Sequence, residues 1–353
     1  MKALVLSGGT GTRMRPLSYS MPKQLVPVAG QPVLARVLAG VRDLGVRDVA
    51  MVVGENAEQI RQALGDGSAW HLQITYLDQD RPRGLGHAVQ VARGFLGDDD
   101  FVMCLGDNVL DGDLTGINAA FRRSGAAAHL VVHKVADPRP FGVADVDADG
   151  RVRRLVEKPA VPTSDLAIVG VYFLTRAVHD AIAAVPLSRR GELELTDALQ
   201  WLVESGADVR AGEFFGYWQD IGQVSDLLSC NRHLLGRQRG QVLGYVDPSS
   251  TVDPQAFVAA GAKVLRSRVH AATFIGPNTV VEDSVIGPYT SIGADCLVRS
   301  ARIDGSIVMD DVRIVDPGHL GGAVIGCGAI VGRADQGPAH RLVVGADARV
   351  ELA

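Results

Sequence analysis

Apolar positions in the first 240 residues follow two alternating periods. Short apolar runs at 3–6, 49–53 and 101–105 have the length of buried strands. Between residues 31 and 44 the apolar side chains instead fall on one helical face, and Gly45 follows as a stop signal. Helical spacing returns over 55–64. Strands that alternate with helices in this way predict βαβ units and a mostly parallel sheet, which is an α/β fold.

The period changes after residue 240. Branched apolar residues there recur at intervals of 5, 6 or 11, and several are followed by Gly and a small residue. Such spacing is typical of hexapeptide repeats that build a parallel β-helix. The polar, basic segment 232–240 is the predicted linker, so we expect two domains, at 1–240 and 241–353. The recurring residues are Val258, Val264, Ile275, Val281, Ile286, Ile292, Val298, Ile325 and Val331.

Composition narrows the class of protein. At 353 residues the chain is long enough for two cores, and 47% hydrophobic with 21% charged residues is ordinary for a globular protein. A net charge of -5 disfavours nucleic acid as a partner, because binding to a phosphate backbone needs a clustered basic surface. The four cysteines are scattered without a C-x-x-C pair, which favours a reduced, cytoplasmic protein. No stretch is long enough to span a membrane.

A glycine-rich turn follows the first apolar run. Gly8, Gly9 and Gly11 carry no Cβ, so their backbone N–H groups can approach an anion closely, and Arg13 and Lys23 add positive charge nearby. The pattern lacks the Gly-Lys-Ser/Thr ending of a P-loop and the third glycine of a dinucleotide fingerprint. It predicts a polyphosphate site, against the alternative of a structural glycine turn. Prolines 16 and 22 predict an extended segment after it.

Two polar positions follow apolar strands farther along. Asp107 comes directly after the strand at 101–105, at a point where a carboxylate faces the crevice of an open sheet. Mg²⁺ prefers one or two carboxylates together with substrate phosphates, although an Asp there can also cap a turn. Gln79 ends another strand, and its amide can pair with a base edge; the alternative is a polar loop residue.

Taken together, these motifs resemble those of the sugar-1-phosphate nucleotidyltransferases. The carrying strings are G-G-x-G-T-R at 8–13, P-K-Q-L at 22–25, Q-x-x-x-x-G at 79–84 and Tyr217-Trp218-Gln219-Asp220, which is similar to the family's W-x-D-x-G element. The resemblance covers residues 1–240 and is greatest to long thymidylyltransferase members with a C-terminal left-handed β-helix. It implies a Rossmann-like catalytic domain that uses Mg²⁺ to transfer a thymidylyl group from dTTP to glucose 1-phosphate, with release of pyrophosphate.

Site residues are carried over from the resemblance by position. Arg13 and Lys23 are the expected catalytic residues, and Asp107 and Asp220 are the expected metal ligands. The expected nucleotide-binding residues are Leu6, Gly8, Gly9, Gly11, Thr12, Arg13, Gln24, Gln79, Gly84 and Asp107. The expected sugar-phosphate-binding residues are Asn108, Gly142, Glu157, Lys158, Val169, Tyr172 and Arg190.

Alternative functions stay open. A UTP-dependent enzyme differs only by a base methyl group, and a contact with one methyl group discriminates by about 1–3 kcal/mol. A regulatory homologue without chemistry is disfavoured by the intact Arg13, Lys23, Asp107 and Asp220. Hexapeptide domains also occur in acyltransferases, which need a histidine base. His270, His319 and His340 are the candidates, but a scaffold for a homo-oligomer is the favoured role of this domain.

Overall fold

The computed structural model describes residues 1–9 and 11–332 and divides into two compact units. The sheet unit holds Met1–Thr10 and Leu34–Asp220, and the stack unit holds Gly11–Val33 and Ile221–Ala353. Residues 11–33 and 221–240 therefore group with the C-terminal strands. The boundary predicted near residue 240 stays a prediction, because a grouping by contacts does not show which parts of the chain fold on their own.

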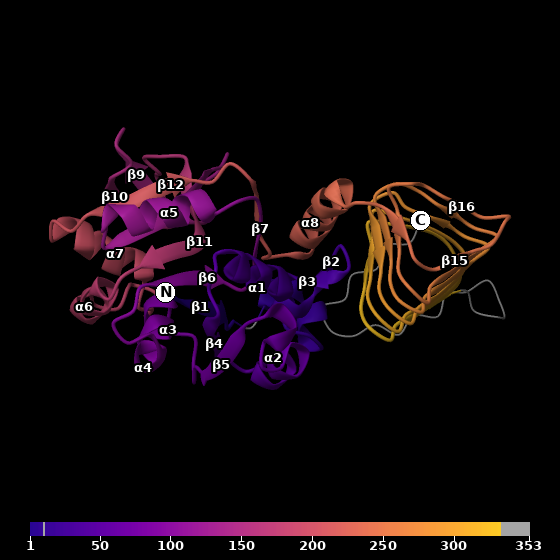
Figure 1. Cartoon of the computed structure of the whole chain (residues 1–353), viewed down its shortest axis with the longest axis horizontal. Helices are drawn as coiled ribbons and strands as arrows, with labels where there is room; N and C mark the ends of the chain where they lie inside the picture. Colours follow the sequence, from indigo (N-terminus) through magenta and orange to yellow (C-terminus); the bar gives the residue numbers. More distant parts are fainter. Residues whose placement is uncertain (10, 333–353) are drawn as a thin grey trace. The chain divides into compact units, whose positions relative to one another are not determined.

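A nine-stranded sheet organises the sheet unit (Figure 1). Strand β1 lies between β4 and β6, parallel to both, and β5 is parallel to β4. Beyond β6 the strands β11, β9 and β10 are antiparallel, while β8 pairs with β11 and with the parallel β12. The bounds are β1 (Lys2–Ser7), β4 (Asp48–Val53), β5 (Gln73–Asp78), β6 (Phe101–Leu105), β8 (Ala128–Lys134), β9 (Gly142–Val146), β10 (Val152–Glu157), β11 (Leu166–Leu174) and β12 (Val209–Glu213).

The strand order locates the site. From β1 the chain goes first to β4 on one side and later to β6 on the other, so β1 is a topological switch point. Ligands of open α/β sheets bind at such points, outside the carboxyl ends of the strands. The ends of β1 and β6 carry Gly8 and Asp107. The parallel strands therefore confirm the predicted α/β class.

Helices cover both faces of this sheet. Ala88, Ile182 and Leu199, from three helices, share one core with Leu4 and other strand residues. On the opposite face the ring of Phe121 lies 5.7 Å from that of Phe173. The helices predicted over 31–44 and 55–64 are confirmed as α1 and α2. The bounds are α1 (Val33–Asp43), α2 (Ala57–Leu64), α3 (Leu85–Val91), α4 (Arg93–Leu96), α5 (Thr115–Ser124), α6 (Ala177–Ala184) and α7 (Leu195–Glu204).

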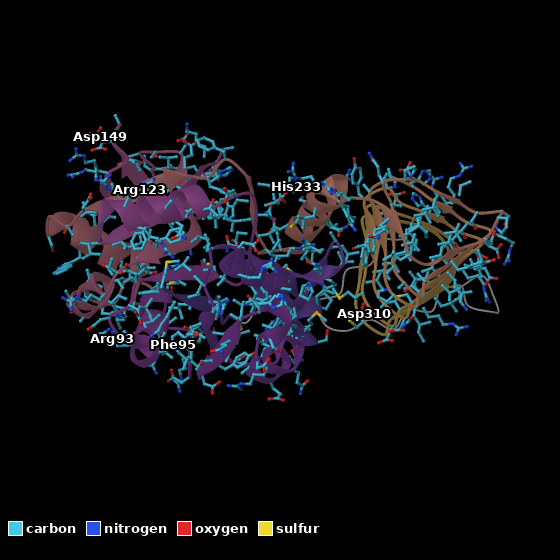
Figure 2. All side chains as sticks on the ribbon, viewed as in Figure 1. Arg93, Phe95, Arg123, Asp149, His233 and Asp310 are labelled. Atoms are coloured by element: carbon cyan, nitrogen blue, oxygen red, sulfur yellow. The ribbon has the colours of Figure 1, made fainter. Side chains whose placement is uncertain are left out.

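The sequence Asp147-Ala148-Asp149-Gly150 forms the turn of a hairpin between β9 and β10. Asp147 Oδ1 accepts hydrogen bonds from the backbone N–H groups of Asp149, at 3.0 Å, and Arg151, at 2.9 Å. This is the local bonding by which Asp favours turns. Asp149 points away from the ribbon at the hairpin tip (Figure 2).

Two local predictions are wrong. The segment after the glycine turn is not extended but forms three single-turn 3-10 helices, at Thr12–Met14, Leu17–Tyr19 and Lys23–Leu25. Proline is compatible with a helix start, and one turn needs few hydrogen bonds. The predicted linker is also partly wrong, because residues 232–237 belong to helix α8 (Val224–Arg237). Leu235 on that helix is buried, so the segment is packed rather than solvated.

The C-terminal strand stack, residues 241–332, is built from short parallel strands. Partners in successive coils are mostly 17 residues apart, as in Val264↔Val281↔Val298, and these side chains are buried. The predicted repeat is therefore confirmed as a structural period, and the parallel strands are compatible with a β-helix. One sheet holds β14 (Gln241–Val242), β17 (Phe257–Val258), β20 (Thr273–Ile275), β23 (Thr290–Ile292), β25 (Ile307–Val308) and β27 (Val324–Ile325). The other holds β15 (Tyr245–Val246), β16 (Thr251–Val252), β18 (Lys263–Leu265), β19 (Arg268–Val269), β21 (Val280–Glu282), β22 (Val285–Ile286), β24 (Leu297–Asp304), β26 (Arg313–Gly321) and β28 (Ile330–Gly332).

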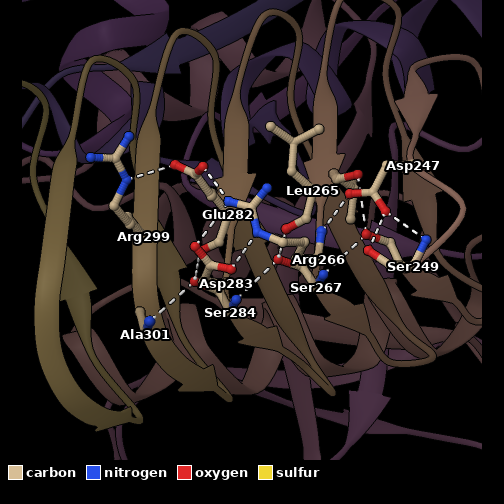
Figure 3. A network of polar contacts seen from close by, with 12 residues as sticks. Asp247, Ser249, Leu265, Arg266, Ser267, Glu282, Asp283, Ser284, Arg299 and Ala301 are labelled. Carbon is tan, nitrogen blue, oxygen red and sulfur yellow. Dashed lines mark hydrogen bonds and ion pairs between the residues drawn. The ribbon is translucent and has the colours of Figure 1, made fainter.

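Serine hydroxyls line one corner of the stack (Figure 3). Ser267 Oγ accepts from the Ser284 N–H at 3.0 Å and donates to the Leu265 carbonyl at 2.7 Å. Ser284 repeats the pattern one coil later, toward Ala301 and Glu282. Each hydroxyl thus satisfies backbone groups that a corner would otherwise leave unpaired, which avoids a penalty of about 1–3 kcal/mol for each group.

Candidate active site

The glycine turn continues directly from β1. Gly9 has φ 107° and Gly11 has φ 59°, a left-handed backbone that strongly favours glycine. Leu6 is a buried residue of β1, while Gly9, Thr12 and Arg13 are exposed. Thr10 lies outside the described residues. The predicted turn is therefore present, with Gly9, Thr12 and Arg13 on the surface.

Arg13 and Lys23 both contact the segment that leads into α8, within the stack unit. The Arg13 guanidinium lies 3.3–3.5 Å from the place that a Cβ on Gly222 would occupy. Lys23 Nζ donates to the Ile221 carbonyl at 3.3 Å. Gln24, one residue along, is buried. The structure thus brings the two expected catalytic cations to neighbouring residues, 221 and 222, directly after Asp220 in the chain.

Gln79 lies beside the glycine turn in the sheet unit. A Cβ added at Gly8 would lie 3.4 Å from Gln79 Oε1, and Gln79 Nε2 lies 2.8 Å from His87 Nδ1. Gly84 follows with φ 97°, and a Cβ there would lie 2.5 Å from the Leu193 carbonyl oxygen. His87 and Leu193 therefore fix a loop that holds the amide of Gln79 near Gly8.

The two expected metal ligands meet at one end of a small sheet. Strands β7 (Asn108–Asp111) and β13 (Tyr217–Asp220) are antiparallel, and Asp220 is the direct partner of Asn108. Asn108 Nδ2 donates to Asp107 Oδ1 at 2.9 Å, and Trp218 Nε1 donates to Asn108 Oδ1 at 2.6 Å. The cross-strand pairing brings residues 107 and 220 close together, although they are far apart in sequence.

A hard divalent cation fits this donor set. Asp107 and Asp220 offer carboxylate oxygens, which Mg²⁺ prefers, and protein sites for Mg²⁺ commonly use only one or two of them. Within residues 1–9 and 11–332, no cluster of three or more His, Cys, Asp or Glu is arranged to hold a metal. A pair of carboxylates completed by substrate phosphates agrees with both observations.

A second polar group gathers around Gly142. Glu157 is its cross-strand partner, and Thr196 Oγ1 donates to Glu157 Oε2 at 2.8 Å. A Cβ at Gly142 would lie 3.2 Å from both of these oxygens, so the glycine leaves room for the pair. Arg190 reaches the same carboxylate, at 3.5 Å, and bonds Glu194 at 2.7 Å. Residues from two segments, Glu157 on β10 and the stretch 190–196, thus form one polar group beside Gly142.

Lys158, Tyr172 and Val169 complete this region. Lys158 is exposed, and its φ of 45° is unusual for a non-glycine residue, a strain that often marks functional sites. Burial raises the pKa of the Tyr172 hydroxyl, and the charge of Glu157 raises it further. Val169 is fully buried, and the ladder between β11 and β8 is interrupted between Ile168 and Tyr172. Val169 therefore lies in this interruption of the ladder.

Sequence reasoning missed several residues of these groups. Thr196 and Glu194 hold Glu157 and Arg190, and Leu193 supports the loop after Gln79. These residues are buried in one short stretch beside α7. No local pattern in the sequence identifies them as supports for side chains from other strands.

One of the candidate acyltransferase histidines has an acidic partner. His319 Nε2 lies 2.6 Å from Asp304 Oδ2, but both side chains are well exposed to solvent. His340 lies outside the described residues. None of the helices within the described ranges has both the length and the apolar character that a bilayer crossing requires.

Comparison with known proteins places the chain in a family. The model of the nucleotidyl transferase family matches residues 2–237. Glucose-1-phosphate thymidylyltransferases from Streptomyces griseus and Streptomyces antibioticus are 45% and 44% identical, each over 100% of this chain and 99% of the relative. A crystallised candidate glucose-1-phosphate thymidylyltransferase from Bacillus anthracis, in complex with sucrose, superposes with a TM-score of 0.62 at 30% identity and covers 65% of this chain and 94% of its own. From the domain match and these full-length identities, the chain belongs to the nucleotidyl transferase family.

Proposed function

We propose that this protein transfers the thymidylyl group of dTTP to α-D-glucose 1-phosphate, giving dTDP-glucose and pyrophosphate. The observation that carries the proposal is the 45% identity to a glucose-1-phosphate thymidylyltransferase over the whole chain. The groups around Gly8, Asp107 and Gly142 support it, because a phosphate turn, a carboxylate pair and a hydroxyl-binding group are what two phosphorylated substrates require. Gly142, Glu157, Val169 and Tyr172 would hold the sugar, and Lys158 and Arg190 its phosphate.

Chemistry at the α-phosphorus needs no covalent enzyme intermediate. A phosphate oxygen of glucose 1-phosphate forms the new O–P bond, while the bond from the α-phosphorus to the bridging oxygen breaks and pyrophosphate leaves. A phosphate monoester is largely a dianion at neutral pH, since its second pKa is about 6, so no general base is required. Catalysis is then positioning and charge neutralisation.

Each charged residue has a role in this scheme. Arg13 and Lys23 bind the β- and γ-phosphates and offset the charge that grows on pyrophosphate. Asp107 and Asp220 would hold Mg²⁺, which when bound neutralises phosphate charge; nucleotidyltransferases of this family are generally metal-dependent. Glycines 8, 9 and 11 with Thr12 supply backbone N–H groups to the triphosphate.

Gln79 is the proposed reader of the base. With His87 Nδ1 accepting one amide hydrogen, Gln79 keeps Oε1 and a second N–H for the ligand. These match the N3–H donor and O4 acceptor that thymine and uracil present. Cytosine carries an amino group at position 4 and no hydrogen on N3, so it is rejected. UTP is the runner-up substrate, since the methyl group contributes little discrimination.

The strand stack is proposed to be a left-handed β-helix that supports a homo-oligomer. In its first coil, Val242, Leu243 and Tyr245 are each about half exposed. Neighbouring exposed apolar side chains of this kind often mark a surface that contacts another protein chain. The expected compartment is the cytoplasm, since Cys104, Cys230, Cys296 and Cys327 are all free thiols. Neither a membrane nor a nucleic acid is an expected partner.

One assay tests the proposed activity. Pyrophosphate release is measured over a matrix of dTTP, UTP, CTP, GTP and ATP against glucose 1-phosphate, galactose 1-phosphate and N-acetylglucosamine 1-phosphate. We expect the highest rate with dTTP and glucose 1-phosphate, a lower rate with UTP, and no significant rate with purines. Turnover with GTP or ATP that rivals dTTP would refute the proposal.

A further inference from the structure

A buried asparagine in the stack unit connects three segments of the chain. Asn231 lies in the middle of α8 and is 1% exposed. Its Oδ1 accepts from the Ala29 N–H at 2.8 Å and from the Ser291 hydroxyl at 3.0 Å, and its Nδ2 donates to the Tyr289 carbonyl at 3.2 Å. One side chain thus joins the N-terminal segment to a coil of the strand stack.

The N-terminal partner of Asn231 is a tight hairpin that follows the 3-10 turn at Lys23–Leu25. Strands β2 (Pro27–Val28) and β3 (Gln31–Pro32) are joined by Ala29 and Gly30, which both have positive φ. The hairpin begins directly after the 3-10 turn of Lys23–Leu25, whose Lys23 carbonyl accepts from the Val26 N–H. The Val26 carbonyl in turn accepts from the Val33 N–H at 3.2 Å. Any displacement of the hairpin therefore moves the backbone of Lys23 and Gln24.

The strand stack also receives the hairpin tip. A Cβ on Gly30 would lie 2.4 Å from the Phe274 ring, which stacks on Phe257 with ring centres 5.4 Å apart. Below the tip, however, a cavity of about 230 Å³ is lined by Met21, Leu25, Ile292 and Met309. The hairpin is therefore held both by the contact of its tip with Phe274 and by the hydrogen bond of its Ala29 N–H to Asn231.

Helix α8 reaches the catalytic residues at its other end. Its capping Asp226 accepts from the N–H groups of Gly222, against which Arg13 rests, and Gln223. Ile221, which accepts from Lys23, comes one residue before Gly222. The segment at the start of α8 therefore contacts Arg13 and Lys23, and Asn231 in the middle of the same helix holds the hairpin that follows Lys23 in the chain.

We propose that Asn231 is a positioning residue for the nucleotide-phosphate site. It holds the hairpin that follows the Lys23–Leu25 turn and ties that hairpin to the coil at Tyr289 and Ser291. The inference rests on the proposed function. It makes the strand stack part of the catalytic apparatus, although no stack residue touches the substrate in this scheme. Loss of Asn231 should therefore weaken use of the nucleotide and leave the use of the sugar phosphate nearly unchanged.

Three variants of the full chain test this inference. Asn231→Leu removes all three hydrogen bonds at similar size, Asn231→Asp keeps the acceptor for the Ala29 N–H, and Ser291→Ala removes one bond on the stack side. Ile303→Ala is the control, because it opens the fully buried core of the stack and removes none of the three hydrogen bonds of Asn231. Initial rates are measured with each substrate varied, together with thermal midpoints and hydrogen exchange of peptides that cover residues 26–33.

For Asn231→Leu we expect kcat/KM for dTTP to fall about tenfold to a hundredfold, the range that small misplacements cause. KM for glucose 1-phosphate should stay within about twofold of the wild-type value. Exchange in 26–33 should quicken. Asn231→Asp should be destabilised yet stay nearer the wild type in nucleotide kinetics, whereas Ile303→Ala should lose stability alone.

Other outcomes overturn the inference. Wild-type kinetics and exchange in Asn231→Leu would do so, as would an equal nucleotide defect in Ile303→Ala. If Asn231→Leu does not fold, unchanged nucleotide kinetics in both Asn231→Asp and Ser291→Ala would refute it. If the wild type itself releases no pyrophosphate from dTTP, the proposed function has failed, and hydrogen exchange over 26–33 still reports whether Asn231 holds the hairpin.

Discussion

Replacing Asp107 or Asp220 with asparagine tests the proposed metal site. Asn keeps the shape of each side chain and removes one negative charge. Unit charges 4 Å apart at an effective dielectric constant of 20 interact by about 4 kcal/mol, and water recovers part of that loss. Removing one preorganised electrostatic group from an active site costs about 2.7–4 kcal/mol. We therefore expect kcat to fall by about a hundredfold to a thousandfold for either variant.

Folding should survive both substitutions, since each carboxylate is partly exposed. The assay is kcat against Mg²⁺ concentration for the wild type and the two variants, and the variants should also need more Mg²⁺. Asp111→Asn is the matched control, because it lies on β7 three residues beyond Asn108, about 10 Å along the strand. Two aspartates that only cap turns would tolerate Asn, so unchanged Mg²⁺ curves in Asp107→Asn and Asp220→Asn would refute the assignment.

Three further predictions concern other parts of the molecule. Gln79→Leu should lower kcat/KM for dTTP by about fivefold to a hundredfold, because one or two contacts with the base are lost, and KM for glucose 1-phosphate should not change. His87→Ala should lower kcat/KM for dTTP less. Equal effects of the two variants, or no effect of Gln79→Leu, would contradict the base-reading role of Gln79. Burial, together with the charge of Arg210, lowers the pKa of His129 to about 4, so the stability that depends on neutral His129 is complete above about pH 6.5 and decreases toward pH 4 by about 3 kcal/mol. The free energy of unfolding of His129→Leu, measured with urea at several pH values, should lack this decrease, and a pH dependence equal to that of the wild type would exclude it. Ser267→Ala should lower the free energy of unfolding by about 1–3 kcal/mol, because the Ser284 N–H loses its acceptor. The control is Ser249→Ala at an exposed position, and equal midpoints of urea unfolding in the two variants would contradict the stabilising role of the serine hydroxyls at the corner.

The sequence predicted the features that depend on residues close together in the chain. Buried strands, the hairpin at Asp147 and the coil period all follow from local periodicity and turn residues, and Asp107 was identified by its place after an apolar strand. Contacts across long separations were not accessible in the same way. The direct pairing of Asp220 with Asn108 depends on how two distant strands align, and Asn231, set among helix residues, has the pattern of a surface position. Polar residues that become buried only through tertiary contacts leave no local signal.

The hairpin at Ala29 and Gly30 also constrains how the number of coils can vary. Asn231 contacts the coil at Tyr289 and Ser291, which follows the end of α8 after a set length of chain. Neighbouring strands lie about 4.8 Å apart, so one coil inserted before residue 272 would carry Tyr289 beyond hydrogen-bonding range. Coils added after residue 332 would leave these contacts in place. We therefore expect relatives that keep an asparagine at this position to gain or lose coils only at the far end, so that the repeat grows in one direction.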